Sequence, residues 1–274
     1  MSSYLRPLYA ARTDPGRVRD HNEDAIQVAE VPSAADALSP WHIFAVADGV
    51  GGHERGEWAS QTAITVLNSE LARVLDESNP ADALRAAFEA ANAAVLEGGG
   101  TLTRFGQHAA TTLVAAVVQQ GKLWWAHVGD SRLYLVRQGQ AQRLTQDHSW
   151  VDEQVRAGLM SQQDALISER RHAITRSIGF GATVEVDAGG PIPLRTADVM
   201  ILCSDGLHGQ VADDELAGIV QQLLPEAAAE RLVDLSNERG GPDNISVIVC
   251  LLFDGSVGDS SRGRRLVPPG ATLP

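Results

Sequence analysis

Three apolar segments of the chain end on an aspartate that lies beside a glycine, and this repeated pattern limits the possible folds most. The first is Phe44-Ala45-Val46-Ala47-Asp48-Gly49, and the others end at Gly129-Asp130 and at Asp205-Gly206. A buried strand that ends on a carboxylate places a charged oxygen at the edge of a sheet, and the glycines let the backbone turn sharply there. The pattern therefore predicts a sheet protein with acidic side chains at its strand ends.

The composition is that of a globular protein with a core, because 44% of the 274 residues are hydrophobic and 21% are charged. A net charge of −13 argues against a nucleic-acid partner, since phosphates need a basic surface. Residues 1–7 lack the apolar segment of a secretory signal, and no apolar run approaches the roughly 20 residues of a membrane span. Cys203 and Cys250 lie in apolar segments and are expected to be buried free thiols. We expect a cytoplasmic monomer.

The predicted elements follow the order strands, two helices, strands, two helices, strand. Two strands are predicted within 8–31, and others at 41–47, 111–119, 122–128, 132–138, 184–187, 198–203 and 245–253. Helical spacing of apolar residues predicts helices at 54–76, 80–98, 213–224 and 225–239, with Asn79 as the cap of the second. The three strands in the middle are expected to be consecutive antiparallel neighbours. This order predicts an α+β fold, a four-layer α-β-β-α sandwich of two antiparallel sheets flanked by helices.

One segment departs from this regular order. Residues 145–178 are polar and show a helical pattern only near 150–157, which indicates a flap beside the sheets. From residue 254 the composition changes to Gly, Ser, Pro and Arg, which predicts a disordered C-terminal tail at 254–274. We therefore expect a single domain over residues 1–253.

Six acidic residues lie at strand ends or in tight turns: Glu23, Asp24, Asp48, Asp130, Asp205 and Asp243. Carboxylates that come close together repel one another, so a cluster of them needs cations. Cysteine and histidine are missing at metal-ligand spacing, and oxygen ligands select Mg²⁺, Mn²⁺ or Ca²⁺. Two such cations can share a bridging water, lower its pKa and direct it at a phosphorus atom.

Six segments, taken in order, resemble the motifs of a known family. They are Arg19-Asp20-His21-Asn22-Glu23-Asp24, Val46-Ala47-Asp48-Gly49-Val50-Gly51-Gly52-His53, Ala110-Thr111-Thr112-Leu113-Val114, His127-Val128-Gly129-Asp130-Ser131-Arg132, Ser204-Asp205-Gly206-Leu207 and Gly241-Pro242-Asp243-Asn244-Ile245-Ser246. This set resembles the metal-dependent serine/threonine protein phosphatases, the PPM or type 2C family in its bacterial form. The resemblance extends over roughly residues 13–253.

The resemblance implies that phosphoserine and phosphothreonine in proteins are hydrolysed by a metal-bridging hydroxide, without a phosphoenzyme. It implies two Mn²⁺ or Mg²⁺ ions and a phosphoprotein substrate. The enzyme would oppose a Ser/Thr kinase and act on its targets, with forkhead-associated domain proteins as one example. The flap would border the cleft and shape substrate choice.

The resemblance also implies the ligands of the two ions. Asp48 would bridge both of them. The carbonyl of Gly49 and the carboxylate of Glu23 would ligate one ion. Asp205 and Asp243 would complete the shell of the other.

Four further roles are implied. Asp24 would hold metal-bound water, and Asp130, together with Asp205, matches positions that hold a third, weaker ion in bacterial members. Arg19 would clamp the substrate phosphate, for which a planar guanidinium fork is suited. Asn244 would orient the metal site.

Two positions depart from the family pattern. Eukaryotic members have a histidine directly after the bridging Asp-Gly, where Val50 stands here, and His53 is not at that position. The general acid therefore stays open, with metal-bound water as one candidate. His208 stands where an aromatic or polar residue is commoner. His148 and His172, both in the flap, are expected to be surface residues or to make local hydrogen bonds.

Two other functions remain possible interpretations of the same residues. One is a phosphoesterase for small-molecule phosphates, and the other is a non-catalytic phosphoprotein-binding module with a degenerate centre. The presence of every expected ligand favours an enzyme.

Overall fold

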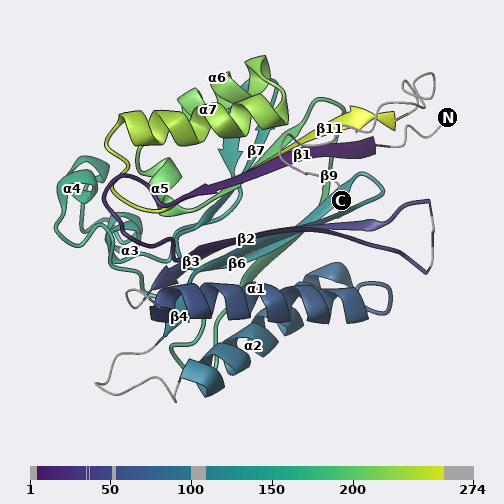
Figure 1. Ribbon diagram of the computed structural model, residues 1–274, viewed down its shortest axis with the longest axis horizontal. Coiled ribbons are helices and arrows are strands. Elements are labelled where there is room, and N and C mark those ends of the chain that lie inside the picture. The colour runs from purple at the N-terminus through teal and green to yellow at the C-terminus, as the bar shows by residue number, and fades with distance from the viewer. Residues whose placement is uncertain (1–4, 35, 37, 51–53, 100–108, 256–274) are drawn as a thin grey trace, which may run out of the picture.

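Strands that are apolar on both faces form the middle of each sheet. Every residue of β10 (Val199–Cys203) is buried, as are all residues of β5 (Leu113–Gln119) except the last. Such strands need a cover on both faces. The computed structural model provides it, because two antiparallel sheets face each other and helices lie on the outer face of each (Figure 1). The predicted α+β four-layer sandwich is confirmed.

The structure describes residues 5–34, 36, 38–50, 54–99 and 109–255. The other strands in this part are β1 (Leu5–Asp14), β2 (Asp24–Val31), β3 (Trp41–Val50), β4 (Ala110–Thr111), β6 (Lys122–Val128), β7 (Arg132–Arg137), β8 (Gln140–Arg143), β9 (Asp187–Pro193) and β11 (Ile245–Asp254). The helices are α1 (Glu54–Val74), α2 (Pro80–Gly99), α3 (Trp150–Arg156), α4 (Gln162–Ile167), α5 (Asp205–His208), α6 (Asp213–Gln222) and α7 (Pro225–Glu238).

Three apolar cores hold the layers together. One sheet has the strand order β1-β11-β10-β7-β8, and the other has the order β2-β3-β5-β6-β9, with β4 paired to β3. The core between the sheets contains Phe44. A second core with Phe88 lies between α1, α2 and the β2-to-β9 sheet, and a third with Leu232 lies between α6, α7 and the β1-to-β8 sheet. The sheets are therefore fixed relative to each other by apolar contact.

The prediction of three consecutive antiparallel neighbours in the middle of the chain is wrong for the third strand. β5 pairs with β6, but β7 pairs with β10 and β8 in the opposite sheet. The chain crosses between the sheets at Gly129, whose φ of +106° suits glycine. A Cβ at Gly129 would also lie 2.6 Å from Thr112. This crossing places Asp130 between the two sheets.

Other differences concern short or irregular elements. The strand predicted at 184–187 lies instead at Asp187–Pro193, because β9 is an edge strand that pairs only with β6 and tolerates its Gly-Gly-Pro sequence there. The short elements β4, β8, α4 and α5 were not predicted. α1, α2, α6 and α7 are confirmed to within three residues at each end, and Asn79 caps α2 by accepting a hydrogen bond from Ala81 N–H.

Cys203 and Cys250 are buried free thiols, as predicted. Among the described residues, no helix combines the length and apolarity that a membrane crossing needs. β11 continues through Asp254, and residues 256–274 of the predicted tail lie outside the described part of the chain.

Candidate metal centre

The pairing of β2 with β3 brings two acidic residues together. Asp24 and Asp48 are direct partners in the antiparallel register. The backbone around Asp48 is held by β4 and β5, because Asp48 N–H donates to Thr112 Oγ1 at 3.0 Å and Thr111 Oγ1 donates to Asp48 O at 2.9 Å. Two carboxylates therefore lie at one end of the β2-to-β9 sheet.

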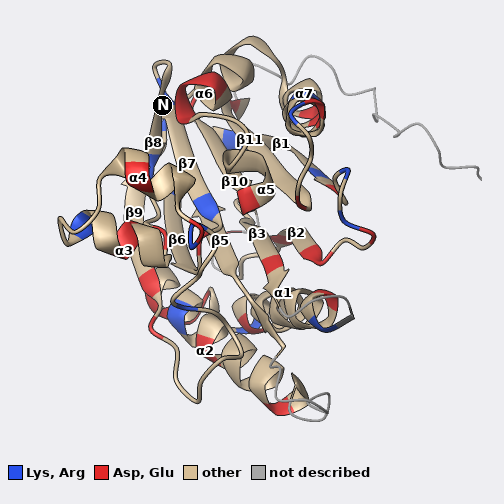
Figure 2. Ribbon diagram, turned by 90° about the vertical axis from the view of Figure 1, so that its left-hand side faces the viewer, with Lys and Arg blue, Asp and Glu red and all other residues tan. Residues whose placement is uncertain are grey.

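The opposite sheet contributes two more carboxylates. Asp205 begins α5 directly after β10, and Asp243 precedes β11. Ser204 joins the two sheets at this point, since its hydroxyl donates to Asp24 Oδ2 at 2.8 Å and accepts from Ser246 N–H at 3.0 Å. Figure 2 shows the acidic segments of β2, β3 and α5 in the same region of the molecule.

Burial raises the pKa of three carboxyl groups in this centre, and neighbouring carboxylates add to the effect. The pKa of Asp24 is raised to about 7, that of Asp130 to about 8, and that of Asp48 lies well above its ordinary value. Burial also acts to raise the pKa of Asp205, but a hydrogen bond from His172 is the largest of the opposing effects that lower it. Without cations, the centre therefore retains protons near neutral pH.

The donor atoms of this centre fit hard divalent cations. Asp24 Oδ1 and Asp205 Oδ1 are buried oxygens without a hydrogen-bond partner in the described part of the chain. Carboxylate oxygens in this state gain from a nearby positive charge, and they favour Mg²⁺ or Mn²⁺ over softer metals. The residues present therefore fit the ions that the sequence predicts.

Glu23 and Gly49 meet at the start of α1. Gly49 N–H donates to Glu23 O at 3.2 Å, and Ser60 Oγ donates to the same carbonyl at 2.6 Å. A Cβ on Gly56 would lie 1.8 Å from Glu23 Oε2, so the absence of a side chain there makes room for the glutamate. α1 thus positions Glu23 beside Gly49, the residue after Asp48. Gly51, Gly52 and His53 lie outside the described residues.

Asn244 connects three parts of the chain around Glu23. Its Oδ1 accepts from Glu23 N–H at 2.8 Å, and its Nδ2 donates to Pro15 O at 3.0 Å and to His21 O at 2.9 Å. Asn244 is 5% exposed, so water does not replace these bonds easily. The amide therefore sets the position of the Glu23 backbone.

Replacing Asn244 by aspartate is expected to lower the free energy of unfolding by about 3 kcal/mol. The substituted oxygen would face two carbonyl oxygens that can only accept hydrogen bonds. Urea unfolding measures the change, and the exposed helix cap Asn79→Asp is the matched control, expected to change it by less than about 0.5 kcal/mol. Equal stability of both variants would show that the Asn244 amide is not required.

Arg19 is paired with one of the predicted ligands. Its NH2 donates to Asp243 Oδ2 at 2.8 Å, and 53% of its side chain remains exposed. This contact raises the pKa of the guanidinium further, mainly through the hydrogen bond to Asp243. Arg19 therefore lies at the edge of the centre with part of its donor set free to face solvent.

Asp130 lies in the crossing between β6 and β7 and is 7% exposed. Its carboxyl group is close enough to Asp205 for that charge to raise its pKa, second only to burial as a cause. The structure thus brings the carboxylates of the two sheets together with Asp130, as the sequence predicts.

The flap follows β8 of the β1-to-β8 sheet and ends at β4, which pairs with β3 of the opposite sheet. Ile178 forms a bridge with Thr111, and within the flap Ser149 forms a bridge with Ile174. Figure 1 shows α3 and α4 of the flap at one end of the sandwich, where β3 and α5 also end. Among the exposed flap side chains are Leu166 and Ile167.

Both flap histidines make local contacts, which is one of the two alternatives expected of them. His172 is exposed, as expected, but its Nδ1 lies 3.5 Å from Asp205 Oδ2, and this contact raises the pKa of the imidazole. His148 is only 2% exposed, so the interpretation as a surface residue is wrong and that of a local hydrogen-bonding residue holds. Ser204 and Thr112 lie in the motifs that resemble the family, but their hydrogen-bonding roles were not predicted, because nothing in the sequence marks a hydroxyl that bonds across a sheet.

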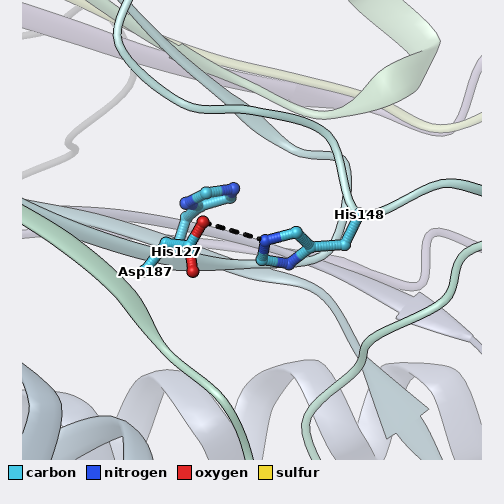
Figure 3. A group of neighbouring side chains, drawn as sticks. All are labelled: His127, His148 and Asp187. Atoms are coloured by element: carbon cyan, nitrogen blue, oxygen red, sulfur yellow. Dashed lines mark hydrogen bonds and ion pairs between the residues drawn. The ribbon is translucent and has the colours of Figure 1, made fainter. Parts of the chain in front are cut away.

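A separate group of possible ligands lies at the start of the flap. One ligand atom each from His127, His148 and Asp187 lie within 4.8 Å of one another (Figure 3). This group contains imidazoles and differs from the carboxylate centre in its residues.

The chain is similar to known proteins in sequence. The family model described as Protein phosphatase 2C matches residues 13–189. The serine/threonine phosphatase stp of Listeria monocytogenes is 36% identical over 246 residues, which cover 87% of this chain and 93% of that protein.

Solved structures are similar over almost the whole chain. The S. agalactiae serine/threonine phosphatase superposes with a TM-score of 0.81 at 32% identity, covering 90% of this chain and 99% of that one. The catalytic domain of the serine threonine protein phosphatase PstP, solved in complex with two manganese ions, gives a TM-score of 0.77 at 31% identity, covering 91% and 100%.

Proposed function

The chain belongs to the protein phosphatase 2C family, and we propose that the carboxylates between its two sheets form the centre that catalyses the family's reaction. The protein is a metal-dependent protein serine/threonine phosphatase that uses Mn²⁺ or Mg²⁺. The observation that carries the assignment is the pairing of Asp24 with Asp48 across β2 and β3, joined through Ser204 to the strand end that bears Asp205.

In this proposal the ligand roles follow the predicted ones. Asp48 would hold both ions, Glu23 and the Gly49 carbonyl would serve one, and Asp205 and Asp243 would serve the other. Support comes from the contact of Glu23 with Gly49 and from the unpartnered, buried Asp205 Oδ1. Bound ions supply Lewis acidity, which lowers the pKa of water and offsets the charge of the phosphate.

The remaining roles belong to groups around these ligands. Asp24, which Ser204 holds by a hydrogen bond, has a second oxygen free to accept from water. Asp130 and Asp205 would hold a third, weaker ion. Arg19 would donate N–H groups to the phosphate oxygens while Asp243 keeps the guanidinium in place. Asn244 would keep Glu23 in position.

The decisive experiment compares the hydrolysis of two substrates by the same enzyme preparation. A phosphothreonine peptide and p-nitrophenyl phosphate are assayed with added Mn²⁺ and again after chelation. We expect Mn²⁺-dependent hydrolysis, with kcat/KM higher for the peptide. A preference for the small ester would favour a small-molecule phosphoesterase. Failure of calorimetry to detect Mn²⁺ binding would favour the non-catalytic binding module.

The wider setting is part of the proposal. Phosphoproteins are the substrates, and we propose that they are the targets of a Ser/Thr kinase that the enzyme opposes, with a forkhead-associated domain protein among the candidates. Two reduced, buried cysteines fit a cytoplasmic location, where thiols stay unpaired. The proposed unit is a monomer with one catalytic domain over residues 1–253 and a flap at about 145–178.

Replacing Arg19 by lysine is expected to raise KM for a phosphothreonine peptide about 10-fold, because an ammonium group cannot offer two parallel N–H donors to one phosphate. The melting temperature should stay unchanged, since half of the side chain is exposed. Arg17→Lys, two residues earlier and also exposed, is the matched control. Identical KM values for both variants would remove Arg19 from the substrate site.

A further inference from the structure

The turn that carries Asp130 is bound by two histidines from different parts of the chain. Gly129 and Asp130 form the crossing from β6 in one sheet to β7 in the other. His148 lies at the start of the flap, and His208 is the last residue of α5, the short helix that begins at Asp205. Both histidines contact the backbone of the turn, so they act on the position of Asp130 and not on its charge.

His148 binds Gly129 through two hydrogen bonds. His148 N–H donates to Gly129 O at 2.9 Å, and Gly129 N–H donates to His148 Nδ1 at 3.1 Å. Because Nδ1 accepts, the neutral ring carries its proton on Nε2, which lies 3.3 Å from Asp187 Oδ2. The carbonyl of His148 accepts from Thr175 N–H at 2.8 Å near the end of the flap. His148 therefore joins both ends of the flap to the turn.

The side chains around His148 fix the orientation of its ring. His127 stacks on it with centroids 4.5 Å apart and ring planes 23° apart (Figure 3). Asp187 accepts from its Nε2 and pairs with Arg176, whose NH1 lies 3.2 Å from Asp187 Oδ1. The ring can therefore present Nδ1 to the turn in one orientation.

The same group does not form a good metal site in this arrangement. His127 Nδ1 has no hydrogen-bond partner in the described part of the chain, which taken alone would favour an ion. However, imidazoles bind metals through lone pairs in the ring plane, and nearly parallel rings do not aim these at one point. The guanidinium of Arg176 already supplies positive charge to Asp187. A positioning role for His148 accounts for more of these contacts.

His208 binds the next residue of the turn. Its Nε2 lies 3.0 Å from Asp130 O, and a carbonyl can only accept, so Nε2 carries the proton. His208 follows Asp205 by three positions in the same short helix. The bond therefore fixes the distance between the backbones that carry Asp130 and Asp205. A leucine or an aromatic ring such as phenylalanine at position 208 could not donate this bond.

We propose that His148 and His208 are positioning residues that hold the Gly129–Asp130 turn. Through this turn, ion binding at the third site of Asp130 and Asp205 is coupled to the stability of the flap. The inference rests on the proposed function for the role of these two aspartates. Since coupling between two sites is reciprocal, an ion at Asp130 stabilises the flap, and a flap held by His148 strengthens ion binding. His208 acts on the ion site through the backbone of Asp130.

The test uses pairs of variants in the full-length protein. His148→Leu and His208→Leu remove the side-chain bonds to the turn, whereas His148→Asn keeps an acceptor near Nδ1 and His208→Gln keeps a donor near Nε2. The Mn²⁺ concentration at half-maximal binding of the weakest site is measured by calorimetry, and hydrogen exchange is measured for residues 149–176. The control is His42→Gln, a partly buried histidine at the other end of β3 from Asp48.

Both leucine variants are expected to weaken the weakest Mn²⁺ site about 10-fold or more, the effect of removing a group that orients a metal ligand. The asparagine and glutamine variants should recover most of this loss, and the control should leave it unchanged. In the absence of Mn²⁺, only His148→Leu should also speed exchange in the flap. Should His148→Leu fail to fold, the His208 pair and His148→Asn decide the question.

The Asp130→Asn variant distinguishes an error in the proposed function of Asp130 from an error in the positioning role of the two histidines. If this variant binds Mn²⁺ like the parent protein, the proposed function of Asp130 is wrong. If it loses the weak site while both leucine variants retain it, the positioning role is wrong and the assignment of Asp130 stands. Equal loss in the leucine variants and in their conservative partners would also overturn the positioning role, because the hydrogen bonds would then not matter.

Discussion

Asp48→Asn is expected to lower kcat/KM for a phosphothreonine peptide by about 10³-fold or more, since losing the bridging carboxylate removes several kcal/mol of metal-based stabilisation. Asparagine has the same shape and lacks the charge that holds two cations. It keeps the backbone bonds to Thr111 and Thr112, so β3 should remain in place.

The same substitution is expected to stabilise the metal-free protein. Asp48 lies among Asp24, Asp205 and Asp130, and their charges and its burial all oppose its ionisation. Removing this repulsion should raise the melting temperature measured with a chelator. Addition of Mn²⁺ should raise the melting temperature of the parent protein but not that of the variant.

Activity assays and thermal unfolding with and without Mn²⁺ check both expectations together. Asp76→Asn is the control, because Asp76 is exposed and binds Ser33 and Trp41, and Trp41 lies at the opposite end of β3 from Asp48. An Asp48→Asn enzyme that keeps its activity, or keeps its Mn²⁺-dependent stabilisation, would be incompatible with a bridging carboxylate.

The sequence was sufficient to predict the acidic strand ends and the layered fold, because both depend on local patterns. Continuous apolar strands and amphipathic helices indicate which apolar faces must pack against another sheet or helix. The aspartate after an apolar strand is equally visible, and Asp48 does end such a strand.

Long-range pairing could not be read from the sequence in the same way. β6 and β7 are separated by three residues and look like a hairpin, yet they belong to different sheets. The choice depends on β10, which lies about 60 residues further along the chain and pairs with β7. The contact of Ser204 with Asp24 and that of His172 with Asp205 also depend on the tertiary fold. The spacing of these residues in the sequence does not predict them.

The metal-free protein is expected to lose about 2 kcal/mol of stability between pH 6.5 and pH 8. The folded-state pKa is raised to about 7 for Asp24 and to about 8 for Asp130, mainly by burial. In this window the folded state binds more protons than the unfolded state, whose carboxyl groups are ionised. Stability from these two groups is therefore fully present below their unfolded pKa and is lost as the pH rises through the folded one.

The window starts near pH 6.5 because histidines act in the opposite direction below it. Burial lowers the pKa of both His148 and His208 to about 4, so the unfolded state binds their protons between about pH 4 and pH 6.5. Their contribution makes stability rise with pH in that lower range. Above it, the carboxyl groups determine the slope.

Asp130→Asn tests the carboxyl contribution directly. Urea unfolding with a chelator at pH 6.5, 7.2 and 8 should give a flatter dependence for the variant, because the asparagine has no proton to lose. With saturating Mn²⁺, the slope of the parent protein should reverse, since metal binding requires ionised carboxylates and is favoured as the pH rises. Equal slopes for the parent and the variant would show that Asp130 is already ionised at pH 6.5. The charge of the centre would then have to be offset by the residues around it, and the need for a third cation would disappear.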